Sequence, residues 1–343
     1  MTVTTAAYAT DQLPGETVDA VVIGGGAAGL NGALMLARSR RTVVVVDGGA
    51  PRNAPAAGVH GLLGLEGISP GALLEKGREE VRRYGGLVVT GEVIAAAPAA
   101  PSAPAAPSAG GDPRFTVTLA DGRTLSARRL LVATGLRDVL PDVRGLAGHW
   151  GQGVVHCPYC HGWEVRDEPT GILAVGPASV HHALLFRQLT DDLVYFTRGT
   201  GLDEDTRARF AARGIRVVDT PVSEVVSAED GGIAGVRLSD GELVPRRVLA
   251  VATTMRARTG GLDELRLPLR DLPGGMGRHF ATGAAGATDV PGVWVAGNAA
   301  DLSAQVGASA AAGALAGARI NADLAVADTD AALDAAERGV TRA

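Results

Sequence analysis

The chain has 343 residues, a formal net charge of −5 and 46% hydrophobic residues. This length is sufficient for two domains with separate cores. The negative charge and the aromatic content of only 3% argue against nucleic acid as a partner. No apolar run reaches the roughly 18 residues that span a bilayer, and the N-terminus has no recognisable secretory signal. The sequence therefore predicts a cytoplasmic protein with neither a membrane nor a nucleic-acid partner.

The first unit of the chain alternates strand, helix and strand. Residues 18–23 are β-formers and predict a buried strand, and residues 30–38 have helical spacing. Residues 42–46 predict a second buried strand, which ends at Asp47. This layout is typical of the first βαβ unit of a nucleotide-binding sheet.

The turn between that first strand and the helix carries the pattern Gly24-x-Gly26-x-x-Gly29. The first glycine permits a tight turn, the second a close approach of a pyrophosphate, and the third close packing of helix on strand. We expect the pyrophosphate at the helix N-terminus and Asp47 at a ribose hydroxyl. The motif in this context predicts a dinucleotide site.

A loop, a helix and several short strands follow. Residues 48–70 are rich in Gly, Pro and Asn and predict a loop, with Arg52-Asn53 and His60 as its polar marks. Residues 72–84 predict an amphipathic helix, and residues 87–90 and 92–95 predict strands.

Residues 96–113 are almost wholly Ala, Pro, Ser and Gly and predict a mobile loop. A hairpin is expected at Asp121-Gly122, between strands at 115–119 and 124–125. Residues 129–134 predict a strand that ends in Ala133-Thr134-Gly135, where small side chains suggest that the backbone lies against a ligand.

A second strand–turn–helix–strand layout begins at residue 171, but its glycine pattern is broken. Ala178 stands at the second glycine position and His181 at the third, and Pro177 removes a backbone donor. After the strand at 193–196 the basic pair that usually grips a 2′-phosphate is missing. The pattern predicts a second Rossmann-like unit without a working NADPH site.

The C-terminal part returns to small residues. Residues 293–298 predict a strand that closes on Gly297-Asn298, and residues 304–324 predict a long alanine-rich helix whose dipole points at the cofactor. From about Ala325 onward we expect an exposed and partly frayed end.

The only two cysteines are Cys157 and Cys160, in the stretch His156-Cys157-Pro-Tyr-Cys160-His161. In a cytosolic protein such a pair is typical of redox catalysis, although it can also supply half of a metal site. A zinc site would need two further ligands, and the flanking histidines are too close in sequence to supply them in the ordinary way. We therefore expect a redox-active disulfide and no metal.

These landmarks, in this order, resemble the low-molecular-weight thioredoxin reductase family over about residues 18–325. The resemblance implies an α/β fold of two Rossmann-like, three-layer domains, with FAD bound in the discontinuous one and the cysteines in the inserted one. The expected boundaries are 1–137, 138–255 and 256–343. The family usually forms homodimers.

The resemblance also implies a set of FAD-binding positions. They are Gly24, Gly26, Ala28, Gly29, Asp47, Gly48, Arg52, Asn53, His60, Val93, Ala133, Thr134, Gly135, Gly297, Asn298, Gln305 and Val306.

Three departures from NADPH-dependent thioredoxin reductases point to one branch of the family. Those enzymes have Cys-Ala-x-Cys-Asp where this chain has a histidine, His161, after the second cysteine. They have an intact second glycine motif, and Gly-Asp in place of Gly297-Asn298. The present pattern is similar to the dithiol oxidase branch, which closes disulfides in natural products such as holomycin and gliotoxin with O2 as the acceptor.

In that branch the substrate thiolate is expected to attack Cys157, and Cys160 is expected to pass the electron pair to FAD. Each exchange step needs a thiolate, and a histidine titrates in the useful range for a base. His161 is the first candidate and His156 the second, with Glu164 able to orient either ring.

Two rival functions stay open at this point. An NAD(P)H-dependent disulfide reductase agrees with the overall layout but not with the broken second motif. A flavoprotein that regulates a partner without turnover is a third reading, and the intact Cys-x-x-Cys-His speaks against it. We favour a dithiol oxidase that acts on a small dithiol.

Overall fold

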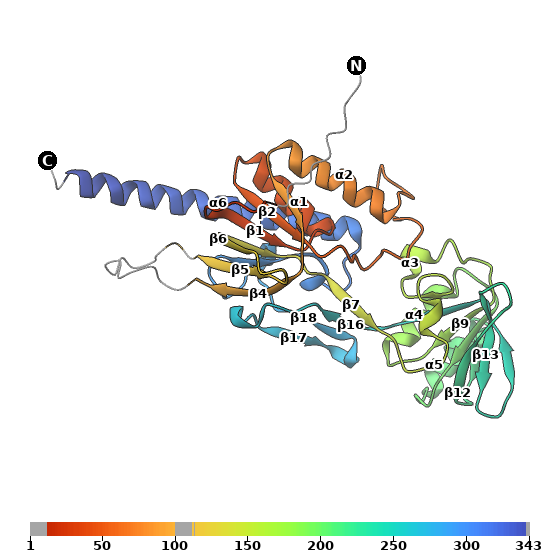
Figure 1. Ribbon diagram of the computed structural model, residues 1–343. Coiled ribbons are helices and arrows are strands. Elements are labelled where there is room, and N and C mark those ends of the chain that lie inside the picture. Colours follow the sequence, from red (N-terminus) through yellow and green to blue (C-terminus); the bar gives the residue numbers. More distant parts are fainter. Residues whose placement is uncertain (1–11, 100–111, 113, 341–343) are drawn as a thin grey trace, which may run out of the picture.

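The computed structural model describes residues 12–99, 112 and 114–340. It has two α/β halves, with the N-terminal and C-terminal segments in one half and the middle of the chain in the other (Figure 1). The predicted fold class, two Rossmann-like units of which the first is discontinuous, is confirmed by the sheets described below. Among the described residues, no helix combines the length and apolarity that crossing a bilayer requires.

The first half is built on a seven-stranded sheet in the order β3-β2-β1-β6-β5-β4, with β19 added to β6. Its strands are β1 (Val18–Ile23), β2 (Val43–Asp47), β3 (Leu87–Thr90), β4 (Val93–Pro98), β5 (Phe115–Leu119), β6 (Thr124–Val132) and β19 (Val293–Val295). The central strands pair in parallel, whereas β4, β5 and β6 form an antiparallel meander. Because β19 lies beyond residue 290, the sheet gains its last strand only when the chain returns from the second half.

Three helices belong to this half: α1 (Ala27–Arg38), α2 (Pro70–Arg83) and α6 (Val306–Val340). The first turns of α6 pack directly on α1 through glycines. A Cβ on Gly313 would lie 1.9 Å from the carbonyl oxygen of Ala28, and one on Gly317 would lie 2.5 Å from that of Gly32. Side chains at these positions would force the helices apart, which explains the run of small residues in both.

The second half holds a five-stranded parallel sheet in the order β11-β10-β9-β15-β8. Its strands are β8 (Val154–Val155), β9 (Thr170–Leu173), β10 (Leu193–Phe196), β11 (Arg216–Val218) and β15 (Val248–Val251). Helices α4 (Ala178–Phe186) and α5 (Glu204–Ala212) pack on one face, and the hairpin sheet of β12 (Val222–Ser227), β13 (Ile233–Leu238) and β14 (Leu243–Pro245) packs on the other. The short helix α3 (Pro158–His161) carries the cysteine pair.

A third sheet connects the halves. It contains β7 (Leu136–Val139), β16 (Thr254–Ala257), β17 (Leu269–Leu272) and β18 (Gly277–Phe280), in the order β17-β18-β16-β7. Strands β7 and β16 are the two crossings between the halves (Figure 1). The predicted boundaries after residues 137 and 255 fall inside these two strands and stay predictions.

Two predictions about order were wrong in part. Of the loop predicted at 96–113, Ala96–Pro98 belong to β4 and pair with Phe115–Val117 of β5, because alternate alanines fit the sheet; the remainder lies almost wholly outside the described residues. The end predicted to fray from Ala325 continues as α6 to Val340. Asp328 explains part of this, since it accepts from Arg41 at 2.6 Å and from Arg128 at 2.7 Å.

Candidate active site

A cavity of about 910 Å³ lies where the two halves meet. This volume is in the range of cofactor and ligand sites. It is lined by the first glycine turn, by the loop at 48–60, by the segment at 298–306 and by the cysteine turn. Every site residue predicted from the sequence lines it except Gly29 and Gly297.

The first glycine turn has the geometry that its sequence requires. Gly24 has φ +113°, and a Cβ there would lie 2.3 Å from the carbonyl oxygen of Ala133. Gly26 is the N-cap of α1, has no side-chain cap, and would project a Cβ into open space. A polyanion can therefore approach the amides of the first helical turn without meeting a side chain.

Gly29 and Gly297 serve packing behind this turn instead of facing the cavity. A Cβ on Gly29 would lie 1.9 Å from the carbonyl oxygen of Gly24, so this position holds the helix against the strand end. Gly297 has φ +69°, and its Cβ would lie 2.7 Å from that of Ala28. Both residues shape the site from outside its lining.

Asp47 ends β2 at the cavity, as predicted, but it has a partner that the sequence did not indicate. Its Oδ2 accepts from the Arg78 guanidinium at 2.8 Å, and its Oδ1 accepts from the Gly49 amide at 2.9 Å. Arg78 stands on α2, 31 residues further along the chain, so no local pattern could have connected them. The pair fixes the carboxylate at the edge where a ribose is expected.

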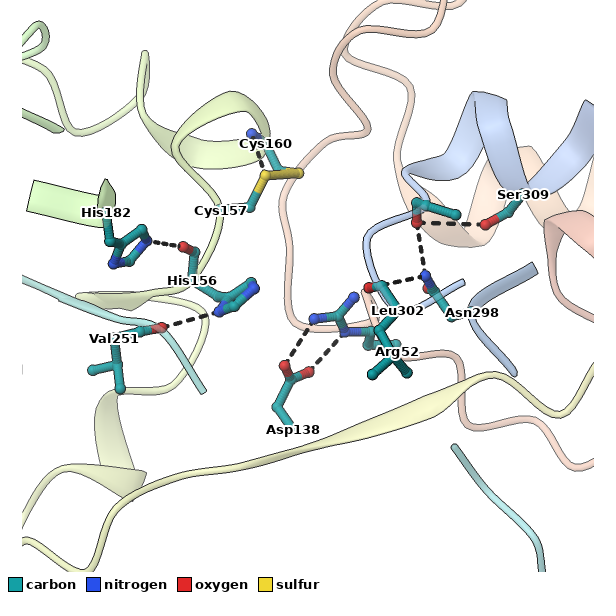
Figure 2. The surroundings of a disulfide bond; sticks show 11 residues. Arg52, Asp138, His156, Cys157, Cys160, His182, Val251, Asn298, Leu302 and Ser309 are labelled. Carbon is teal, nitrogen blue, oxygen red and sulfur yellow. Dashed lines mark hydrogen bonds and ion pairs between the residues drawn. A yellow bond between two sulfur atoms is a disulfide. The ribbon is translucent and has the colours of Figure 1, made fainter. Parts of the chain in front are cut away.

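The two other small-residue segments at the cavity are fixed by hydrogen bonds. The Thr134 hydroxyl donates to the carbonyl of Arg258 at 2.7 Å, and Gly135 turns with φ +70°. Asn298 donates through Nδ2 to the carbonyls of Asp301 at 3.0 Å and Ala304 at 2.8 Å. Figure 2 shows how Asn298 holds the turn that leads into α6, where Gln305 and Val306 line the cavity.

Arg52 forms a bidentate ion pair with Asp138, both contacts at 2.7 Å. Asp138 lies on β7 with its side chain only 5% exposed, and it also accepts from the Thr253 hydroxyl at 2.7 Å. The Arg52 guanidinium holds the pKa of Asp138 below its usual range despite burial, which raises it. Arg52, a predicted FAD contact, is therefore anchored through Asp138 to β7, one of the two strands that connect the halves (Figure 2).

Cys157 and Cys160 form a disulfide across the first turn of α3, with their Cα atoms 5.2 Å apart. Cys157 is the N-cap, and its sulfur accepts from the Cys160 amide at 3.2 Å. Both residues are partly exposed and line the cavity (Figure 2). Because the sulfurs are bonded to each other, they do not form half of a metal site.

His156 is held by the end of β15. Its Nδ1 lies 3.0 Å from the carbonyl oxygen of Val251 and 3.3 Å from the Thr253 hydroxyl. The Thr253 amide also points at Nδ1, at 3.3 Å. The Val251 carbonyl is nearer and can only accept, which favours the proton on Nδ1 and a lone pair on Nε2. Burial lowers the pKa of His156, and the nearby Asp138 carboxylate opposes that shift.

His161 stands at the C-terminal end of α3, and its Nε2 is buried with no hydrogen-bond partner among the described residues. Burial lowers the pKa of His161, and the charge of Glu164 opposes this. Glu164 was expected to orient one of the two histidines beside the cysteines. Instead its Oε1 lies 3.3 Å from His60 Nε2, while His60 Nδ1 lies 2.7 Å from Glu66 Oε1.

His182 was missed as a candidate and lies beside the cysteine turn. It is 7% exposed, and its Nε2 donates to the carbonyl of His156. Burial lowers its pKa to about 4, so the ring is neutral at neutral pH. His182 directly follows the third position of the broken motif, and the sequence favours a structural role for it, with a place at a substrate mouth as the alternative.

The second glycine turn is closed by its own side chains. The Ser179 hydroxyl accepts from the Val175 amide at 3.0 Å, and Pro177 occupies the N-cap of α4. Arg198 donates to the carbonyl of Ala174 at 3.0 Å, so the one arginine after β10 bonds to the turn itself. A Cβ on Gly176 would meet nothing nearer than 3.5 Å, the carbonyl oxygen of Gly274.

The first turn, by contrast, fits FAD. It offers an uncapped helix N-terminus, a glycine that leaves open space at Gly26, and a carboxylate at the end of β2. The second turn also has no side-chain cap and has space at Gly176, but Pro177 removes a backbone donor from it, and Arg198 follows its strand where the first unit has Asp47.

Comparisons with known proteins agree with this site. The family described as pyridine nucleotide-disulphide oxidoreductase matches residues 18–317. Thioredoxin reductase tcpT of Claviceps purpurea is 32% identical over 259 residues, which cover 73% of this chain and 78% of that protein. Thioredoxin reductase sirT of Leptosphaeria maculans is 35% identical, over 65% of this chain and 70% of that protein.

Two solved structures are also similar. The crystal structure of HlmI has a TM-score of 0.86 and 44% identity, and covers 96% of this chain and 99% of that one. An oxidoreductase from Agrobacterium tumefaciens has a TM-score of 0.81 and 32% identity, over 91% and 99%. The resemblance to thioredoxin reductases found in the sequence is confirmed. The chain belongs to the pyridine nucleotide-disulphide oxidoreductase family and is a thioredoxin reductase-like, FAD-binding disulfide oxidoreductase.

Proposed function

We propose that the protein is a dithiol oxidase, which closes an intramolecular disulfide in a small dithiol and uses O2 as the electron acceptor. The observation that carries this proposal is the contrast between its two nucleotide turns. The cysteine pair lines the same cavity as the intact first turn, whereas at the second turn Pro177 has no amide to donate, and Ser179 and Arg198 form hydrogen bonds to its own backbone. An enzyme that takes electrons from thiols needs the first arrangement and has no use for a nicotinamide site.

The thiol chemistry balances as two disulfide exchanges. A substrate thiolate attacks the Cys157 sulfur, the Cys157–Cys160 bond breaks, and Cys160 leaves as a thiolate. The second substrate thiolate then attacks the sulfur bound to Cys157, which closes the substrate disulfide and releases Cys157 as a thiolate. The Cys160 amide, 3.2 Å from the Cys157 sulfur, stabilises that leaving thiolate.

FAD, when bound, would supply the two-electron acceptor needed to restore the cysteine disulfide, with O2 as the final acceptor. The residues that would hold it are the predicted set: the first glycine turn, Asp47, the loop at 48–60, Val93, the segment 133–135 and the segment 297–306. The Arg52–Asp138 pair fixes one wall of this site by joining the loop to a crossing strand.

The substrate thiol must lose its proton, and we propose His156 as the base, with His161 as the second candidate. The sequence alone favoured the reverse order. The Val251 carbonyl fixes the tautomer of His156 so that Nε2 can accept a proton, and the lowered pKa keeps the ring neutral. His161 is also neutral by burial, but no hydrogen bond orients it among the described residues.

A second candidate function is an NAD(P)H-dependent disulfide reductase, which the names of the fungal relatives favour. Anaerobic mixing separates the two. We expect a small dithiol to bleach the flavin of the purified enzyme within seconds, and NADPH or NADH at the same concentration to leave it oxidised. Rapid bleaching by a nicotinamide would replace the oxidase with the reductase.

Cysteine variants test the assigned roles. Cys157→Ser and Cys160→Ser should each abolish O2 consumption with dithiols while FAD stays bound. A long-wavelength absorption band should develop in Cys157→Ser alone, because Cys160 is assigned as the cysteine whose thiolate contacts the flavin. A band in Cys160→Ser alone would reverse the two roles.

Gly26→Ala tests the cofactor turn without a packing defect. The added methyl meets no protein atom within 4 Å, so the apoprotein should melt as the wild type does. It occupies the space beside the helix N-terminus, so FAD affinity should fall by about tenfold or more. Unchanged FAD affinity, measured by titration of apoprotein, would remove the pyrophosphate from this turn.

We also retain the prediction of a homodimer, with the boundaries 1–137, 138–255 and 256–343. Sedimentation of the FAD-loaded protein tests the dimer.

A further inference from the structure

A row of three arginines crosses the third sheet, away from the flavin cavity. In the strand register Arg256 of β16 pairs with Arg137 of β7 on one side and with Arg278 of β18 on the other. Directly paired residues of neighbouring strands point to the same face of a sheet, about 5 Å apart at their Cα atoms. Three guanidinium groups therefore share one face.

These side chains line a pocket of about 530 Å³. Thr254 and Thr259 are also part of its lining, so two hydroxyl groups stand beside the guanidinium groups. The backbone of Gly275 and Gly277 forms part of the wall. The row is therefore the floor of a concave surface and not a convex, fully hydrated face.

The charges in this pocket do not balance. Its lining contains a single carboxylate, Asp271, which is paired in register with Arg278 and lies 3.4 Å from its Nε. In the described part of the chain, neither Arg137 nor Arg256 forms an ion pair. Like charges opposite one another on neighbouring strands destabilise a sheet.

Among the described residues, some exposed arginines elsewhere form ion pairs and others, such as Arg216, form none. Arg207 meets Asp219 at 2.9 Å, and Arg209 meets Asp205 at the same distance. The chain as a whole carries a net charge of −5, so carboxylates to balance three arginines are not scarce. The row is distinguished by the strand register, which places three arginines side by side, and a multivalent anion would turn their mutual repulsion into attraction.

We propose that this pocket, the arginine pocket, binds a multivalent oxyanion of the phosphate type. Guanidinium groups bind phosphate and carboxylate oxygens through paired N–H donors, and the Thr259 hydroxyl adds a neutral donor, whereas that of Thr254 donates to the Gly275 carbonyl at 3.4 Å. The pocket is distinct from the flavin cavity. Asp138 and Met255, which alternate with the arginines along β7 and β16, line the cavity on the opposite side of the same two strands.

The test measures binding by titration calorimetry on the FAD-loaded protein, with pyrophosphate, inorganic phosphate and citrate at constant ionic strength. Pyrophosphate should bind the wild type, and Arg256→Gln should weaken it by about tenfold or more, since a charge-assisted bond is lost. Asp271→Asn should strengthen binding, because it removes the opposing charge. Arg216→Gln, at an exposed arginine of β11, is the matched control and should bind as the wild type does.

Stability supplies an independent readout. Without added anion, at low ionic strength, Arg256→Gln should melt at the same temperature as the wild type or higher, because the repulsion is relieved. Pyrophosphate should raise the melting temperature of the wild type but not that of Arg256→Gln. Citrate binding as tight as pyrophosphate would assign the site to carboxylates and overturn the phosphate-type choice. Absence of binding by all three anions, or equal binding by Arg256→Gln and Arg216→Gln, would overturn the site itself.

Discussion

The two glycine turns of this protein have the same place in the same βαβ layout, but their backbones differ. Gly24 is held in the left-handed region at φ +113° against Ala133, whereas Gly176 lies outside that region with its nearest neighbour at 3.5 Å. In the first turn the N-cap is a glycine, and in the second it is Pro177, which has no amide to donate, while the Ser179 hydroxyl bonds to the Val175 amide. The same sheet and helix can therefore carry two different turns, because packing holds the fold and only a few backbone positions would hold a ligand.

The strand ends that follow each turn differ in the same way. β2 ends in Asp47, which faces the cavity and is steadied there by Arg78. After β10 comes Arg198, which bonds back to the turn through the carbonyl of Ala174. Burial lowers the pKa of Arg198, because its guanidinium lies partly inside the protein and not in solvent where a phosphate could reach it.

The largest expected effect tests this contrast directly with Gly24→Ala and Gly176→Ala. At position 24 the new methyl would meet the Ala133 carbonyl oxygen at 2.3 Å in a strained backbone, so stability should fall by at least about 3 kcal/mol. FAD should be lost as well. Denaturant unfolding and the flavin absorbance of the purified protein measure both effects.

Gly176→Ala is the control, because the same methyl has space there. It should retain FAD and dithiol oxidation, and its stability should change by no more than about 0.5 kcal/mol. If Gly176→Ala lost FAD and stability as Gly24→Ala does, the backbone difference between the two turns would not explain why FAD binds at the first.

The sequence predicted the first turn well because every requirement there is local. Strand, glycines and helix follow within about twenty residues, and their spacing encodes the geometry. From Pro177 and Ala178 the sequence also predicted a second unit without a working NADPH site, and this stays a prediction. The contacts of the second turn could not be predicted, because Ser179 turns back to Val175 and Arg198 reaches Ala174 from another strand.

The next effect concerns the bases at the cysteine turn. His156→Gln should lower kcat/KM for a dithiol by about 100-fold or more, because a positioned base contributes on that order. Since burial lowers the pKa of His156, the wild-type acid limb should lie below pH 6.5, with activity lost as pH falls through it. That limb should disappear in the variant.

His161→Gln is the matched comparison, with the same substitution on the other side of the disulfide. It should lower kcat/KM by less than His156→Gln and keep the acid limb in place. The reverse ranking in pH profiles of the two variants would restore His161 as the base.

His182 extends the comparison to the helices behind the two turns. α1 buries only apolar residues and glycines, whereas α4 buries this histidine with a pKa of about 4. The folded protein prefers the neutral ring, so its contribution to stability is fully present above about pH 6.5 and is lost as pH falls toward 4. The loss should approach about 3 kcal/mol at pH 4.

Unfolding by urea at a series of pH values measures this loss. His182→Gln keeps a donor for the His156 carbonyl but does not titrate, so its stability should vary less between pH 6.5 and 4. An identical pH dependence in variant and wild type would show that other groups cause the acid loss.

Two side chains at the site could not be placed from the sequence, because residues of other elements orient them. His182 and Glu164 were placed by neighbours from other elements: His182 by the carbonyl of His156, and Glu164 by His60 on the loop of the other half. The disulfide of the Cys-x-x-Cys pair was predictable, because two intervening residues already bring the two sulfurs together. Motifs that act through their own backbone were predictable, and side chains oriented across the cavity were not.

The smallest expected effect separates two arginines: Arg198, which follows β10, and Arg78, which lies on α2 and contacts the end of β2. Arg198→Met removes one hydrogen bond to the Ala174 carbonyl but fills similar space, so stability should fall by about 1 kcal/mol with no change in FAD affinity. Arg78→Met frees the Asp47 carboxylate, and FAD affinity should change by a few-fold while the fold is retained. Titration of the two apoproteins with FAD makes the comparison. If Arg198→Met lowered FAD affinity as much as Arg78→Met did, the second turn would contribute to FAD binding. The proposal that it has no part in nucleotide binding would then be wrong.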